Sequence, residues 1–166
     1  PQHTFVKKPR VVVLVSPTFY HQRKRFYEGT ACEVLPLLFR WSALNAHQLR
    51  VLMGLTNEDK QLYVGVMLDL LRSYQRDGRI PNFDDFREEV ANPANAQGQS
   101  APLKQRFKLL ESLVAEASPN ETLRAYQRDL ASLVAEGVLV VADLTDPMLS
   151  AAEANGIFEV LLAQFR

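Results

Sequence analysis

The chain has 166 residues, of which 47% are hydrophobic and 23% are charged, a composition typical of a single globular domain. Nineteen basic residues balance nineteen acidic ones, which excludes the strong overall field of a protein that binds DNA or an anionic membrane with its whole surface. The single cysteine, Cys32, excludes an internal disulfide, and the three histidines are too far apart in the sequence for a zinc motif.

The N-terminal region carries no targeting signal that we can identify. No unbroken apolar run is longer than that of residues 11–15, which is far shorter than the roughly 20 residues that cross a bilayer. No basic segment followed by an apolar stretch marks a secretory signal. We therefore expect an intracellular protein, cytoplasmic or nuclear, with no membrane partner. Because the sequence starts at Pro1 and stops at Arg166 inside a helical pattern, we expect residues 1–166 to form one domain or subdomain of a larger protein.

Two apolar runs predict strands that are buried on both faces, at about residues 10–16 and 138–142. The first run is Val-Val-Val-Leu-Val and is followed by Ser16 and Pro17, and the second lies between Gly137 and a polar turn at residues 143–147. Strands of this kind pair in parallel sheets. Since two strands alone are only marginally stable, we expect their missing partners to lie outside this chain.

The segment between these strands shows helical periodicity. The spacing of apolar residues and the capping residues predict helices at about 46–53, 57–77, 102–117, 121–136 and, after the second strand, 151–165, with a short polar helix that starts after Asn82 or Asp84 and ends at about Val90. Residues 92–100 contain no apolar side chain larger than alanine and predict a mobile loop. The expected fold class is α/β, mostly helical, with two buried strands flanking a large helical block.

Asp143 and Asp146 form a candidate acidic site at the end of the second strand. A P-loop enzyme holds its magnesium carboxylate at the end of such a strand, because that edge of the sheet faces the phosphates. However, Leu144 follows Asp143, where a catalytic glutamate would polarise water. The alternative is structural, with both carboxylates supporting the turn before Pro147.

A cluster of aromatic and basic residues follows the first strand and predicts a contact loop at residues 19–27. Aromatic rings stack on the bases of single-stranded nucleic acid while cations follow the phosphates. The alternative is a solvated surface or a protein contact, in which the rings pack on the domain and the cations stay in water. The candidate contact residues are Tyr20, His21, Arg23, Lys24, Arg25 and Tyr27.

Several catalytic motifs are missing from the sequence. None of the seven glycines stands in the G-x-x-x-x-G-K-[ST] pattern that cradles nucleotide phosphates. No G-x-S-x-G elbow occurs, and Cys32 has no activating base near it in the sequence, so we expect a small buried thiol there. Trp41 lies among apolar residues and is expected in the core. We therefore name no catalytic residue and no metal ligand for the isolated chain.

Three segments resemble the middle of HerA/FtsK-type P-loop ATPases. They are FYEGTACEVLPLLFRWSALNAHQLRVLMGL at residues 26–55, LVAEGVLVVADLTDP at residues 133–147 and SAAEANGIFEVLLAQFR at residues 150–166. In that superfamily a helical insert follows an early core strand, and a strand that ends in a DL[ST] triplet follows the insert. Asp143, Leu144 and Thr145 match this triplet.

The resemblance implies the helical-insert region of a ring-forming DNA translocase or helicase, without its Walker A and Walker B motifs. The chain would supply ring-interface and nucleic-acid or partner contacts, and nucleotide state would reach it through the strand ends at Ser16 and Asp143. Its partners would be the rest of the parent ATPase, DNA or RNA, and further copies in a homo-oligomer, and ATP and Mg²⁺ would bind only in the parent. The alternative is a stand-alone helical interaction or dimerisation module with an exposed stripe of Ile157, Leu161 and Phe165.

Overall fold

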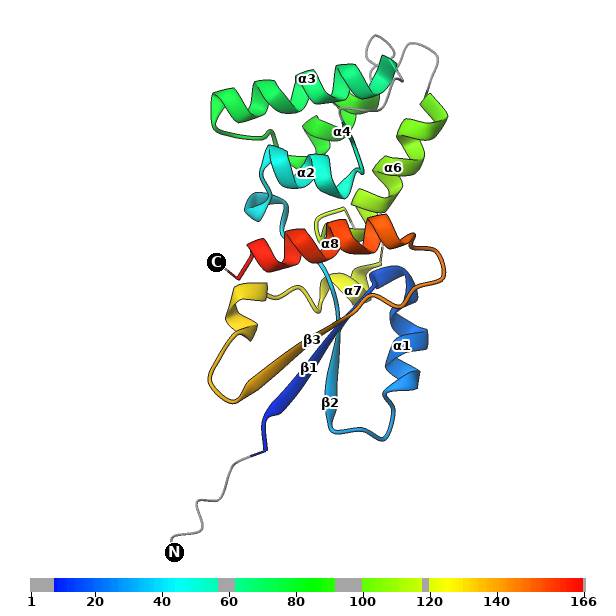
Figure 1. The fold of residues 1–166 in the computed structure, drawn as a ribbon, viewed down its shortest axis with the longest axis vertical. Helices are drawn as coiled ribbons and strands as arrows, with labels where there is room; N and C mark the ends of the chain where they lie inside the picture. Colours follow the sequence, from blue (N-terminus) through cyan, green and yellow to red (C-terminus); the bar gives the residue numbers. More distant parts are fainter. Residues whose placement is uncertain (1–7, 57–61, 92–99, 118–119, 166) are drawn as a thin grey trace, which may run out of the picture.

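The computed structural model describes residues 8–56, 62–91, 100–117 and 120–165. They form a small sheet beneath a lobe of helices (Figure 1). In chain order the elements are β1 (Arg10–Val15), η1 (Pro17–Phe19), α1 (Tyr20–Phe26), β2 (Cys32–Pro36), η2 (Trp41–Ala43), α2 (Ala46–Leu52), α3 (Leu62–Asp77), α4 (Phe83–Ala91), α6 (Ser100–Leu113), α7 (Glu121–Arg124), η3 (Leu130–Leu133), β3 (Val138–Asp143) and α8 (Ala151–Ala163). The predicted class, α/β with a dominant helical block, is confirmed.

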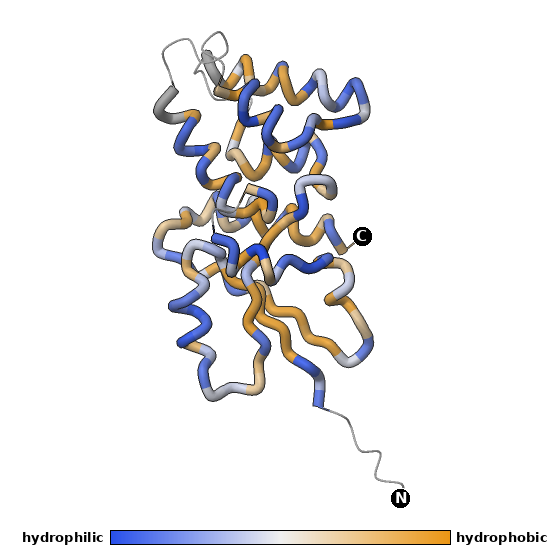
Figure 2. The backbone as a smooth tube through the Cα atoms, turned by 180° about the vertical axis from the view of Figure 1, so that it is seen from behind, coloured by the Kyte–Doolittle hydropathy of each residue, from blue (hydrophilic) through white to orange (hydrophobic). Residues whose placement is uncertain are grey.

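The sheet is parallel and has the order β2-β1-β3. Val15 at the end of β1 lies opposite Pro36 on one side and Asp143 on the other, so the carboxyl ends of all three strands meet at one edge. Both predicted strands exist. The expectation that every partner strand lies outside the chain was wrong, because β2 pairs with β1 from within it. Figure 2 shows the strands as hydrophobic segments of the backbone.

The two faces of the sheet pack against different parts of the chain. Val12 and Leu14 of β1 belong to the large core, which also contains Ile157, Val160 and Leu161 of α8 and most buried side chains of the helical lobe. The alternate residues Val13 and Val15 belong to a smaller core, together with Tyr20 of α1 and Leu123 of α7. The strand period of two therefore divides β1 between two cores, with α8 covering one face and α1 the other.

Most predicted helices form, because their caps and apolar stripes are local. Asn45 and Gln48 make a reciprocal capping box at α2, Ser150 and Glu153 make another at α8, and Asn120 caps α7. Trp41 lies in the core, as predicted. The loop predicted at residues 92–100 lies outside the described residues, except that its last residue begins α6.

The prediction of a single helix over residues 121–136 was wrong. The chain instead forms the short α7, then turns, and resumes as η3, which Asp129 caps through the N–H of Ala131. Leu123 packs in the smaller core, whereas Leu130 and Leu133 pack in the large core. Because these cores lie on opposite faces of the sheet, one straight helix could not serve both.

A cluster of aromatic rings packs in the core of the helical lobe. Phe86, fully buried, lies 5.1 Å from the ring centroid of Trp41 and 5.9 Å from that of Phe107. The Trp41 indole N–H donates a 2.7 Å hydrogen bond to the carbonyl of Pro81, which satisfies its polar atom.

Within the described parts of the chain, none of the helices combines the length and apolar character needed to span a bilayer.

Candidate functional site

The strand order makes the carboxyl ends of β1 and β3 the candidate site. The chain moves from β1 to β2 on one side of β1, and later returns to place β3 on the other side. At such a switch in strand order, open α/β sheets bind their ligands beyond the carboxyl ends of the strands. Ser16 and Thr18 follow β1 here, while Asp143 ends β3 and Asp146 follows it.

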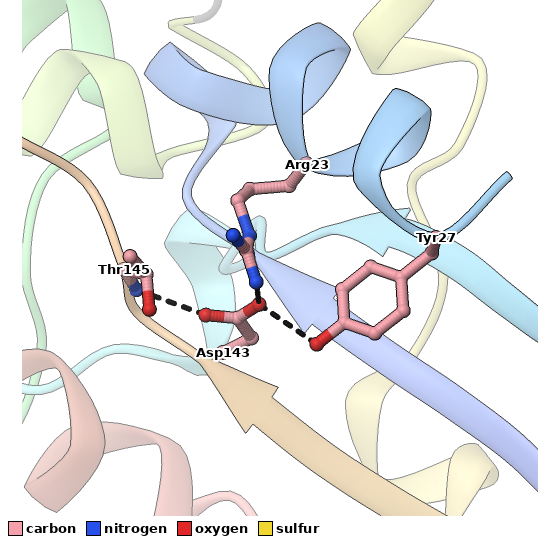
Figure 3. Close-up of polar contacts among 4 residues, drawn as sticks. All are labelled: Arg23, Tyr27, Asp143 and Thr145. Atoms are coloured by element: carbon pink, nitrogen blue, oxygen red, sulfur yellow. Dashed lines mark hydrogen bonds and ion pairs between the residues drawn. The ribbon is translucent and has the colours of Figure 1, made fainter.

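Asp143 lies at the centre of a network that joins β3 to α1 (Figure 3). Its Oδ2 atom accepts hydrogen bonds from Arg23 Nε at 2.8 Å and from the Tyr27 hydroxyl at 2.9 Å, and it also accepts one from Arg23 Nη2. Its Oδ1 atom accepts the backbone N–H of Thr145 at 3.0 Å. The Arg23 and Asp143 side chains are only 14% and 8% exposed, so this ion pair is largely removed from water.

Asp146 makes a second network, which joins the β3 turn to the end of β1. Its Oδ2 atom accepts hydrogen bonds from the hydroxyl of Ser16, at 2.6 Å, and from that of Thr18. Its Oδ1 atom accepts the backbone N–H of Met148 at 2.8 Å. Asp146 and Ser16 are both buried. This network ties together two segments that are 130 residues apart in the sequence.

Both carboxylates are held in the ionised form. Burial by itself would raise the pKa of Asp143, but hydrogen bonds from Thr145, Tyr27 and Arg23 outweigh burial and place the pKa below its ordinary value. Burial also opposes ionisation of Asp146, and donors from Ser16, Thr18 and Met148 again bring the pKa below its ordinary value. The donors of the protein itself therefore compensate the buried charges.

This geometry bears directly on the choice between a magnesium site and a structural site. Every carboxylate oxygen of Asp143 and Asp146 accepts at least one hydrogen bond from the protein. A cation would have to displace Arg23 from Asp143 in order to reach Oδ2. Among the described residues, no group of three or more His, Cys, Asp or Glu side chains could hold a metal ion. The contacts thus support the structural interpretation, in which the two carboxylates fasten the strand ends.

The aromatic and basic segment after β1 is helical, not a loop as the sequence suggested. Residues 20–26 form α1, which places Arg23 and Tyr27, one helical turn apart, on the side that meets Asp143, while Tyr20 is buried against the sheet. The candidate contact residues are therefore divided. Tyr20, Arg23 and Tyr27 serve the fold, whereas His21, Lys24 and Arg25 are exposed.

The exposed side of α1 borders a pocket of about 400 Å³ beside β2. His21, Lys24 and Arg25 supply its basic side, and Glu28 and Cys32 also line it. Phe26, next in the chain, is 66% exposed. Lys24 Nζ lies 5.5 Å from the ring centroid of Tyr20, so the cation sits over an aromatic face while its surroundings stay open to water. Cys32 is half-buried on this edge strand.

Thr18 was not identified from the sequence, and Thr145 was named only as part of the DL[ST] match. Thr18 acts through a hydroxyl two residues after Ser16, and Thr145 acts through its backbone N–H. A serine and a threonine directly after a buried strand are the one hint in the sequence, since polar residues there face the carboxyl edge of a parallel sheet.

Comparison of the chain with protein-family models, with curated proteins and with solved structures finds no match.

Proposed function

We propose that this chain is a contact-making part of a HerA/FtsK-like P-loop motor, not catalytic by itself, with α1 as its nucleic-acid or partner surface. The HerA/FtsK assignment rests on the sequence resemblance around Asp143, Leu144 and Thr145. The observation that carries the contact role is the exposed side of α1, which carries Lys24 and Arg25, together with the 66% exposed ring of Phe26, which lies against the guanidinium of Arg23. Cations next to an exposed aromatic ring suit a flexible single strand better than a duplex.

The rest of the site supports a role in positioning. Arg23 lies on the same helix but pairs with Asp143, and Tyr27 donates to the same carboxylate. This pairing orients α1 on the sheet, so that a load on its exposed face would reach the carboxyl ends of β1 and β3. In the proposed motor, ATP and Mg²⁺ bind in the parent protein, and this chain responds to them through those strand ends.

The experiment is an anisotropy titration of a labelled single-stranded oligonucleotide with the purified chain over a salt series. We expect weak binding whose affinity falls with salt, since phosphate contacts release counterions. Replacing Lys24 and Arg25 by Gln should lower the salt slope by about 1.4, at about 0.7 for each lost contact to a single strand. A labelled ATP analogue, titrated in parallel, should not bind.

The matched control is the variant with Arg72→Gln and Arg76→Gln, which removes the same charge from two exposed positions of α3 in the helical lobe. It should bind the oligonucleotide as the original chain does. Equal loss in both variants would mean that only net charge matters, and no binding by any of them would reject the nucleic-acid role.

The alternative, a helical interaction module, is favoured by one observation on α8. The prediction of an exposed stripe that includes Ile157 and Leu161 was wrong, because both side chains are buried in the large core. Instead, Phe158 and Leu162 are 44% and 47% exposed on the same helix. If α8 mediates dimers, sedimentation velocity should show a concentration-dependent dimer that Phe158→Ser with Leu162→Ser abolishes.

A further inference from the structure

The two outer strands of the sheet differ in what their free edges offer. The Arg10 N–H donates to the Gly137 carbonyl, and Arg10 lies opposite Val138. In a parallel ladder this register directs the backbone groups of the odd-numbered β3 residues toward β1. The backbone groups of Val138, Val140 and Ala142 therefore point outward. Of their N–H groups, only that of Val138 donates to a backbone carbonyl among the described residues, that of Ala135.

The outer edge of β2 is blocked by its sequence. The Leu37 N–H donates to the Val15 carbonyl, which directs the odd-numbered residues of β2 toward β1 and leaves Cys32, Val34 and Pro36 facing outward. Pro36 has no N–H to donate, and proline is a common device for protecting an edge strand. The edge of β3 has no proline and no charged residue before Asp143.

The side chains around β3 are also left incompletely covered. β1 and β3 have equally apolar sequences, but β1 is buried over its last four residues, whereas β3 is buried only at Asp143. On one face of the sheet, Leu139 is 51% exposed. On the other face, α8 leaves Phe158 and Leu162 partly exposed. An exposed apolar side chain such as Leu139 beside an unpaired edge is what an added strand would cover.

The handedness of the fold indicates the same edge. The β1–α1–β2 crossover has its helix on the face of the smaller core, and α8 lies on the opposite face. Nearly all crossovers between parallel strands are right-handed. Crossovers over opposite faces therefore step in opposite directions across the sheet. A strand joined to the end of α8 would step away from β1, onto the outer edge of β3.

We propose that the outer edge of β3 is the docking site for a further β-strand, an extended apolar segment that runs parallel to β3 and bonds to the outward backbone groups of Val140 and Ala142. This proposal is independent of nucleic-acid binding, because α1 and its pocket lie beside β2, at the opposite edge of the sheet (Figure 1).

The probe is a fluorescent peptide with the sequence of residues 7–16, since β1 already pairs in parallel with the other edge of β3 and its Lys and Arg residues keep the peptide soluble. We expect saturable binding, measured by anisotropy, and none for a scrambled peptide. Ala142→Pro removes one outward N–H without touching the ladder to β1, and should weaken binding about tenfold or more. Val34→Pro removes an outward N–H from β2, and should leave binding unchanged.

Two further measurements keep the test decisive if a proline variant unfolds. Leu139→Lys preserves the backbone, and its charge beside the edge should also oppose strand addition. Hydrogen exchange of the original chain should show fast exchange at Val140 and Ala142, with the peptide protecting these amides. The proposal is overturned if the peptide does not bind, if Leu139→Lys and Ala142→Pro bind it as well as the original chain, or if the edge instead pairs with a second copy in a dimer that Ala142→Pro dissociates.

Discussion

Replacement of Arg23 by Ala is the sharpest test of the role given to Asp143. The substitution removes both guanidinium hydrogen bonds and leaves a carboxylate that is 8% exposed. Breaking one partner of a buried ion pair typically costs about 3–5 kcal/mol. Because Tyr27 and Thr145 still donate to Asp143, we expect the lower end of this range, about 3 kcal/mol. In a chain of this size, that loss corresponds to a fall in Tm of about 6–12 °C.

The assay is urea unfolding followed by circular dichroism, with thermal unfolding alongside it. The control is Arg25→Ala, which makes the same substitution two residues further along α1, where the side chain is exposed. Surface substitutions of this kind usually change the free energy of unfolding by less than about 0.5 kcal/mol. If Arg23→Ala destabilised the protein no more than Arg25→Ala, the ion pair would not be fastening α1 to the sheet, and the structural interpretation of the site would fail.

Three further predictions address other parts of the fold. The hydrogen bonds of Asp143 hold its folded-state pKa below the unfolded value of about 3.9. Its contribution to the free energy of unfolding is therefore present above about pH 4 and is lost as the pH falls through the lower folded value. Urea midpoints from pH 7 to pH 3 should decline in the original chain and decline less in an Asp143→Asn variant. Gly65→Ala should stabilise α3 by about 0.5–1 kcal/mol, because no heavy atom lies within 4 Å of the added Cβ. Gly156→Ala should not give this stabilisation, because its Cβ would lie 3.2 Å from Val51 Cγ1. Equal Tm values for the two variants would contradict this prediction. Phe86→Ala should cost about 3–5 kcal/mol in urea unfolding, since the ring is fully buried among other rings, and a cost below 1 kcal/mol would show that this cluster does not hold the helical lobe together.

Local signals made much of the helical fold predictable. A capping residue acts within one turn, so Asn45 and Ser150 marked the starts of α2 and α8 correctly. The β-branched run of β1 was also recognisable, because a strand buried on both faces is apolar at every position. β2 was missed because its five residues include Glu33 and end at Pro36, which breaks the apolar run expected of a buried strand.

The residues of the site were mostly identified from the sequence, but as two unrelated candidates. Arg23 and Tyr27 were assigned to a contact loop, and Asp143 to a strand end about 120 residues away. Only the register between β1 and β3, together with the packing of α1 on one face, brings them within hydrogen-bonding distance. The division of the basic cluster into partly buried Arg23 and exposed Arg25 likewise depends on which side of α1 faces the sheet.

The sequence by itself therefore determined the elements whose causes are local: apolar runs, helical stripes, caps and the lack of a phosphate-binding loop. The tertiary structure alone decided which strands are neighbours, which face each helix covers and which charges are paired. The physical reason is that pairing and burial join residues far apart in the chain, such as Ser16 and Asp146, and no short-range pattern records that contact. For the same reason, the open edge of β3 became visible only once β1 and β2 were in place beside it.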